Sequence, residues 1–200
     1  MTRFTITKSF LLLLISAFVL GGCGSSSSSK SNPDALTVEG RAIQGPVAFA
    51  TIIADKNGNR QADADEATTT TDDNGDFFDL VIPANYGDYL LVSIGGTDIL
   101  SGRPALPMVA LPGTRHITPL TTLVALTPAA QRSALITTVE TLVGEKYDTD
   151  HSDPNGVPAN LLALTKAIEE TQILLRDLGV TETAEQLVVA ANLAASTADL

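Results

Sequence analysis

The chain has 200 residues, with 12 Lys and Arg against 23 Asp and Glu, and therefore a formal net charge of -11. This acidic balance excludes nucleic-acid binding, because contacts to phosphate require clustered basic side chains. The single cysteine excludes a disulfide framework and a cysteine-based zinc site, and the two histidines argue against a histidine-rich metal centre. The aromatic fraction of 4%, with no tryptophan, argues against an aromatic platform for sugars. The length suits one compact domain or two small ones.

The N-terminal residues have the pattern of an export signal. Arg3 and Lys8 precede an apolar segment at 10–20, which is shorter than the ~20 residues that a bilayer span requires. The Leu-Gly-Gly-Cys sequence that ends at Cys23 resembles the lipobox of bacterial lipoproteins. This resemblance implies cleavage before Cys23, a diacylglycerol on its thiol and acylation of the new N-terminus. The alternative is an ordinary signal peptide with a chance cysteine near its cleavage site.

A low-complexity segment follows the cysteine. Residues 24–34 are rich in Ser and contain no apolar side chain, so burial cannot offset the entropy cost of ordering them. We therefore predict a signal peptide at 1–22 and a flexible tether at 23–35. Gly24, beside the cysteine, resembles the pattern of outer-membrane sorting in Gram-negative lipoproteins. The expected location is the cell envelope, lipid-anchored, with the outer membrane favoured over the inner one.

The next part of the chain has the period of β-strands and frequent turn signals. Strands are predicted at 36–42, 47–54, 67–71, 77–82, 89–94 and 108–111. The segment at 67–71 is polar and rich in Thr, which favours an edge position. Asp73-Asn74-Gly75 is a strong turn signal before the next strand. Six or seven short strands at this spacing predict a small antiparallel β-sandwich over residues 36–112.

The loop at residues 55–66 (the 55–66 loop) has the residue pattern of a calcium site. It carries oxygen-bearing side chains at positions 1, 3, 5, 9 and 12, and position 7 offers a backbone carbonyl. Calcium requires about six to eight oxygen ligands, and this spacing is that of an EF-hand loop. The predicted ligands are Asp55, Asn57, Asn59, Gln61, Asp63 and Glu66. The predicted role of the ion is structural, since it would order a long loop.

Two features of the 55–66 loop depart from an EF-hand. Arg60 occupies the sharp-turn position that is usually glycine, and Gly58 lies two places earlier. Strands rather than helices are expected on both sides of the loop. The alternative is a solvated acidic hairpin loop without a metal ion.

Several segments together resemble the carboxypeptidase regulatory-like domains of bacterial surface proteins. They are the Val-Glu-Gly-Arg-Ala-Ile-Gln-Gly-Pro-Val sequence at 38–47, the 55–66 loop, and the Thr-Asp-Asp-Asn-Gly-Asp-Phe sequence at 71–77. Such domains are transthyretin-like or prealbumin-like sandwiches, and their calcium-loop variants resemble the B-type repeats of Gram-positive adhesins. The resemblance covers about residues 36–94. It implies a non-catalytic scaffold, stalk or adhesion module.

The last part of the chain is predicted to be helical, with helices at 119–126, 128–143, 158–178 and 184–195. The capping signals are Thr118, Thr127 and Thr183 before helices, and Gly144 and Gly179 after them. In the third helix an apolar stripe predicts core packing, with an exposed partner groove as the alternative. The stripe comprises Leu161, Leu164, Ile168 and Leu175, widened by Leu162, Ile173, Leu174 and Leu178. The predicted fold class is α+β, a small antiparallel sandwich at 36–112 followed by about four helices at 113–200.

A second acidic cluster lies at residues 147–156. It is predicted to be a loop between helices, because no Glu follows at a distance that would close a coordination shell. A metal site there is the alternative. His151 within this segment is expected to be exposed to solvent, and His116 is expected at the surface or at a helix cap.

The sequence contains no nucleophile elbow, no phosphate loop and no zinc-protease motif. We therefore expect a non-enzymatic envelope lipoprotein, a calcium-stabilised scaffold or adhesion module that contacts a membrane through its lipid and a protein or cell-surface partner. The alternative is a ligand-binding lipoprotein with a pocket between sandwich and helices, serving a transporter or an envelope enzyme. A catalytic fragment is the least favoured interpretation.

Overall fold

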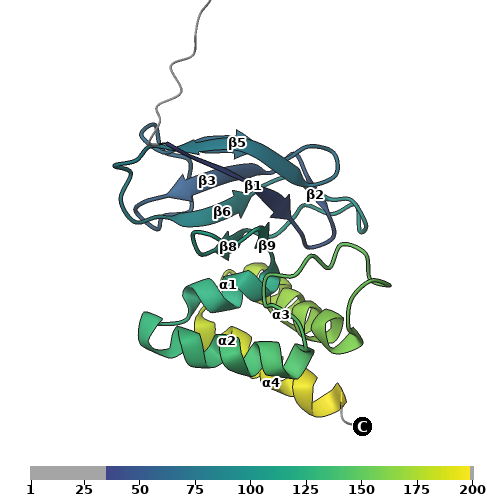
Figure 1. Ribbon diagram of the computed structural model, residues 1–200. Coiled ribbons are helices and arrows are strands. Elements are labelled where there is room, and N and C mark those ends of the chain that lie inside the picture. Colours follow the sequence, from purple (N-terminus) through teal and green to yellow (C-terminus); the bar gives the residue numbers. More distant parts are fainter. Residues whose placement is uncertain (1–34, 199–200) are drawn as a thin grey trace, which may run out of the picture. The chain divides into compact units, whose positions relative to one another are not determined.

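A computed structural model describes residues 35–198 (Figure 1). The predicted signal peptide, the predicted lipid-bearing Cys23 and nearly all of the predicted tether lie outside the described residues. Within residues 35–198 the chain forms nine strands and then four helices, so the fold is mixed α+β. These strands and helices belong to one compact unit.

The strands are β1 (Leu36–Ala42), β2 (Val47–Ala48), β3 (Thr51–Asp55), β4 (Thr68–Thr70), β5 (Asp76–Ile82), β6 (Leu90–Ile94), β7 (Thr97–Asp98), β8 (Met108–Ala110) and β9 (His116–Ile117). The helices are α1 (Pro119–Leu126), α2 (Ala129–Val143), α3 (Ala159–Asp177) and α4 (Ala184–Ala198). Strands β4, β3, β6 and β8 form an antiparallel sheet in that order, with β4 at the predicted edge. A three-stranded sheet has the order β5-β1-β9, where β1 is antiparallel to β5 and parallel to β9. Strands β2 and β7 form a short antiparallel pair.

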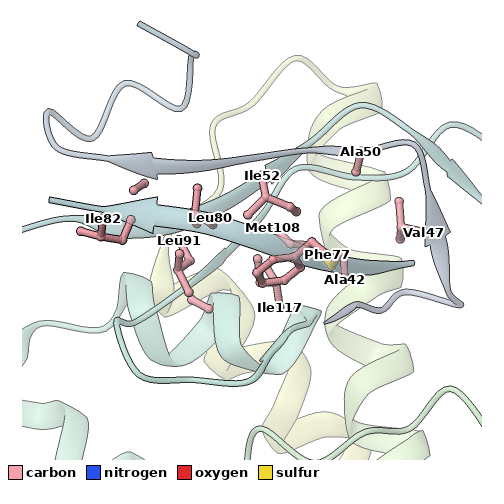
Figure 2. Packing of buried hydrophobic residues seen from close by; sticks show 12 residues of the cluster. Ala42, Val47, Ala50, Ile52, Phe77, Leu80, Ile82, Leu91, Met108 and Ile117 are labelled. Atoms are coloured by element: carbon pink, nitrogen blue, oxygen red, sulfur yellow. The ribbon is translucent and has the colours of Figure 1, made fainter. Parts of the chain in front are cut away.

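Side chains from both larger sheets form the main apolar core (Figure 2). Its members include Ala42, Phe77, Leu80, Ile82 and Ile117 from the three-stranded sheet, and Ile52, Leu91 and Met108 from the four-stranded sheet. Because side chains alternate along a strand, Ile53 points to the opposite face of β3 from Ile52. There Ile53 packs against Ala125 of α1. The four-stranded sheet is therefore buried on both faces at β3.

Helix α1 lies between the sheets and the other helices. Seven of its eight residues, Pro119 to Ala125, are buried. Its buried Thr121 and Thr122 hydroxyls donate to the carbonyls of Val109 and Thr118, so the polar groups inside α1 are paired. Ala125 contacts the four-stranded sheet, whereas Leu120 and Leu123 join a second apolar cluster with α2, α3 and α4.

Most helix ends follow the predicted local signals. The Thr118 hydroxyl accepts a hydrogen bond from the Thr121 N–H at 3.0 Å, and the Thr121 hydroxyl accepts one from the Thr118 N–H at 2.8 Å. Gly144, with φ of 75°, ends α2 in the left-handed conformation. The Thr183 N–H donates to the Gln186 side chain at 2.8 Å. These capping predictions are confirmed.

The predicted cap at Thr127 is wrong. Its hydroxyl donates to the Leu123 carbonyl at 2.8 Å, so Thr127 ends α1 instead of starting α2. The N-cap of α2 is Pro128, and no side chain caps this helix start. The prediction failed because only two residues separate α1 from α2, so one threonine had two helices within reach.

The predicted strand at 47–54 is interrupted. Phe49 has φ of 59° and is 68% exposed, and it separates β2 from β3. The buried Thr71 hydroxyl holds this break, since it donates to the Val47 carbonyl at 2.7 Å and accepts from the Ala50 N–H at 2.8 Å. The short strands β7 and β9 were not predicted, because two residues are too few to produce a detectable period.

The apolar stripe of α3 is narrower than predicted. Leu161, Leu164, Ile168 and Leu175 are buried as expected, but Leu174 and Leu178 are exposed. Thr165, Glu169 and Gln172 are buried instead, at positions four and three residues apart on the helix. The face of α3 that packs into the unit is therefore partly polar.

Candidate functional site

The 55–66 loop connects β3 to β4 and is built around the carboxylate of Asp55. This side chain closes β3 and is only 1% exposed. Its Oδ1 accepts from the N–H groups of Asn57 at 3.1 Å and Gly58 at 2.7 Å, and its Oδ2 accepts from the Arg60 N–H at 2.9 Å. Three backbone donors therefore turn toward one carboxylate, which curls the first half of the loop around the predicted first ligand.

The next two predicted ligands, Asn57 and Asn59, both contact Asp63. The Oδ1 atoms of Asn57 and Asn59 accept from the N–H groups of Asn59 at 2.9 Å and Gln61 at 2.7 Å. Their Nδ2 groups both donate to Asp63 Oδ2, at 2.7 and 2.9 Å. The loop thus brings Asn57, Asn59 and Asp63 together, with the positive ends of two amide dipoles against a carboxylate.

Glu66 closes the loop. Its Oε1 accepts from the Lys56 N–H at 2.8 Å and its Oε2 accepts from the Asp63 N–H at 3.3 Å. Gln61 lies at the surface, and its backbone N–H binds Asn59 as described. The side-chain oxygen atoms of five of the six predicted ligands therefore accept hydrogen bonds within this one loop.

Tyr86 holds the base of the loop, which the sequence did not indicate. Its hydroxyl donates to the Ala54 carbonyl and accepts from the Ala67 N–H, both at 2.7 Å. These two residues lie immediately before and after the 55–66 loop. The Tyr86 ring also contacts Tyr89 edge to face at 5.7 Å, and the Lys56 ammonium lies 5.0 Å from its centroid. Tyr86 is 32 residues from Ala54 along the chain, so no local pattern could have identified it.

Arg60 has a left-handed backbone conformation at the position where a calcium loop usually has glycine. Its φ is 57°, a value that glycine adopts readily. At this position the departure from the EF-hand pattern lies in the residue type, and the strands β3 and β4 flank the loop as predicted. The side chain of Arg60 leaves the loop and pairs with Glu182 at 2.7 Å.

The loop fits calcium in its donor atoms, which are all oxygen, and in its sharp turn. The amide groups of Asn57 and Asn59, however, turn their N–H₂ ends toward Asp63, so an ion would require both amides to rotate and present oxygen. Within residues 35–198 no group of three or more His, Cys, Asp or Glu side chains is arranged to hold a metal ion.

The second acidic segment, at 147–156, forms the connection between α2 and α3, as predicted. Asp150 accepts from Arg41 Nη1 at 3.0 Å and from the Ser152 N–H at 2.9 Å. Arg41 also binds Asp76 through Nε at 2.7 Å. This hydrogen bond to Asp76 raises the pKa of Arg41 further above its ordinary value. The segment thereby ties the helices to β1 and β5.

The prediction of an exposed His151 is wrong, whereas His116 is partly exposed beside an open hollow. His151 is only 7% exposed, with Nδ1 3.3 Å from the Thr149 carbonyl and Nε2 without a hydrogen-bond partner. His116 is half-buried in β9, and its Nδ1 is buried without a partner. Burial lowers the pKa of both imidazoles, because it disfavours the charged form. The acidic neighbours of His151 in the sequence favour an exposed position, but the fold buries this side chain.

Two open hollows differ in character. One, of about 350 Å³, is polar and lies where strands meet the 147–156 segment, lined by Glu39, Arg41, Asp76, Arg115, His116 and Asp150. The other, of about 440 Å³, is apolar and lies among the helices, lined by Pro128, Leu135, Ala184, Val188 and Val189. A third, smaller hollow of about 170 Å³ is lined by Arg60, Leu106 and Pro107 from the strand part of the chain and by Gln172 and Leu175 of α3.

Comparison of the chain with protein families, curated protein sequences and solved structures finds no significant match. The functional argument therefore rests on the residues of this chain. No helix within the described residues combines the length and the hydropathy that a membrane span needs.

Proposed function

We propose that this protein is a non-enzymatic lipoprotein of the cell envelope that serves as a calcium-stabilised scaffold or adhesion module. Its two larger sheets would form a small sandwich of the carboxypeptidase regulatory-like type, followed by a helical module. Cys23 would carry the lipid, and residues 23–35 would hold the folded part away from the membrane. The shared core of the two sheets supports the sandwich, and the pattern around Cys23 supports the anchor.

The 55–66 loop carries the calcium part of the proposal. The supporting observation is the positive φ of Arg60 at the sharp-turn position, which glycine usually holds in calcium loops. The ligands would be Asp55, Asn57, Asn59, the Gln61 carbonyl, Asp63 and Glu66. The ion would take the place of the amide N–H groups that now balance the charge of Asp63.

The surroundings of the loop support a structural role for the ion. The carboxylates of Asp55 and Glu66 accept hydrogen bonds from backbone N–H groups of the same loop. The order of the loop therefore depends on the carboxylates that would bind the ion. An ion that binds only the ordered loop stabilises the folded state by about 2.7 kcal/mol when present at a hundred times its Kd. For a chain of this size that corresponds to a rise in Tm of about 8 °C.

The test is calcium titration of the full chain in mild detergent, by calorimetry and thermal unfolding, with magnesium as a comparison. Asp63→Ala removes a predicted ligand and should abolish both the binding heat and the rise in Tm. Asp65→Ala is the matched control, because it removes the same side-chain carboxylate from an exposed neighbour that pairs with Lys56. Binding that survives Asp63→Ala, or no heat in the unmodified chain, would refute the calcium site.

The polar hollow favours a second candidate function, a ligand-binding lipoprotein that serves a transporter or an envelope enzyme. The hollow is open, and it is lined by charged groups from the strands together with Asp150 from the helix connection. Native mass spectrometry of the chain purified from membranes would test this candidate. A small molecule retained by the unmodified chain, and lost after Arg115→Ala, would favour it over the scaffold; an unliganded mass would oppose it.

A further inference from the structure

Arg60 stands at a position where its backbone conformation is unfavourable. Residues with a Cβ atom seldom adopt positive φ, and the φ of Arg60 is 57°. Glycine would make this turn without strain, as Gly58 does two residues earlier with φ of 74°. The contacts of its side chain account for an arginine at this position.

The Arg60 side chain reaches a carboxylate that is distant in sequence and nearly buried. Arg60 Nη1 lies 2.7 Å from Glu182 Oε1, and the Glu182 side chain is 11% exposed. The other oxygen, Oε2, accepts from Gln172 Nε2 at 2.8 Å, and Gln172 itself is buried on α3. Glu182 lies in the connection between α3 and α4. One chain of contacts therefore runs from the 55–66 loop to two helices.

The main chain of Arg60 makes the other half of this link. Its N–H donates to Asp55 Oδ2 at 2.9 Å, and Asp55 is the residue around which the loop curls. The backbone of Arg60 thus contributes to loop order, and its side chain contributes to the docking of the helices. Loss of either contact should therefore weaken the other.

An open hollow of about 170 Å³ lies beside this pair, lined by Arg60, Gln172 and Glu182 together with Leu106, Leu175 and Val180. Without Arg60 the carboxylate of Glu182 would keep only Gln172 as a partner, which is unfavourable for a nearly buried charge.

We propose that Arg60 is a positioning residue that couples the order of the 55–66 loop to the docking of the α3–α4 connection. Loop order holds the guanidinium in reach of Glu182, and Glu182 in return holds Arg60 in its left-handed conformation. Such coupling is reciprocal in free energy, so loop order favours the docking of the connection as much as docking favours loop order. The part of the test that uses calcium rests on the proposed function; the part without calcium does not.

The first experiment is amide hydrogen exchange of the calcium-free full chain. Glu182→Gln should speed exchange in the 55–66 loop, although the substitution lies 122 residues from Arg60. Glu185→Gln is the control, because it removes the same charge from an exposed position nearby and should leave the loop unchanged. Equal loop protection in Glu182→Gln and in the unmodified chain would overturn the proposal.

Substitutions at Arg60 keep the test decisive if Glu182→Gln fails to fold. Arg60→Gly keeps the turn and removes the side chain, so it should speed exchange in the α3–α4 connection. Arg60→Lys retains a cation and should restore part of that protection. Unchanged exchange of this connection in Arg60→Gly would also overturn the coupling.

The second experiment measures the Kd for calcium alone, well below the unfolding temperature. Glu182→Gln should weaken binding roughly fivefold or more, with no change in Glu185→Gln. A merely structural pair would lower Tm and leave Kd unchanged, which would contradict the proposal. If the unmodified chain binds no calcium, the proposed function fails, and the calcium-free exchange still decides whether Arg60 couples the two parts.

Discussion

The hydroxyl of Tyr86 offers the sharpest test of how the fold supports the 55–66 loop. Tyr86→Phe removes one oxygen atom and keeps the ring, with its edge-to-face contact to Tyr89. The lost atom binds the Ala54 carbonyl and the Ala67 N–H, which lie at the two ends of the loop. The substitution therefore leaves two backbone groups without their partner, and it leaves the apolar packing as it was.

The expected cost follows from those two hydrogen bonds. Each contributes about 1 kcal/mol net, so Tyr86→Phe should lower the free energy of unfolding by about 2 kcal/mol. For a chain of this size that corresponds to a fall in Tm of about 6 °C. Because the loop base would loosen, hydrogen exchange in the 55–66 loop should also become faster.

Tyr89→Phe is the matched control. It removes the same atom from the ring that packs on Tyr86, and the Tyr89 hydroxyl has no partner among the hydrogen bonds of the described residues. Its change in Tm should be close to zero. Chemical denaturation and calorimetry on both variants measure the difference. Equal Tm values for the two variants would refute the reasoning that the Tyr86 hydroxyl closes the loop.

Three further predictions concern other parts of the chain. Thr71→Val should lower the free energy of unfolding by about 3 kcal/mol in denaturation, because it leaves the buried Val47 carbonyl and Ala50 N–H unpaired; Thr71→Ser should retain most of the stability. Since burial lowers the pKa of His151, the unfolded chain binds more protons, and stability should fall as pH drops below about 6.5. His151→Gln should reduce this slope in denaturation measured from pH 7.5 to 5.5, and an unchanged slope would contradict the assignment. Cys23→Ser should release the protein from the membrane fraction, and intact mass should show the loss of acyl chains; retention of both would exclude lipid at Cys23.

Local signals in the sequence determined most helix ends and several strands. Thr118 caps α1, Gly144 ends α2, and Thr183 pairs with Gln186, because each of these contacts joins residues no more than four apart or depends on one backbone angle. The same holds for the positions of the oxygen-bearing residues in the 55–66 loop. Spacing along the chain is enough for such features, since the turn brings neighbours together.

Tertiary contacts decided the features that the sequence did not indicate. The break at Phe49 depends on Thr71, whose hydroxyl binds Val47 from 24 residues away. The burial of His151, which is only 7% exposed, is also a tertiary feature, because the acidic residues beside it in the sequence favour an exposed position.

The candidate site divides in the same way between sequence and structure. Its ligand types and their spacing are local and were predicted from the sequence. The hydroxyl of Tyr86 at its base and the pairing of Arg60 with Glu182 required the folded chain. A contact between residues 122 positions apart leaves no periodic trace in sequence, because its energy depends on two surfaces that meet only after the chain has folded.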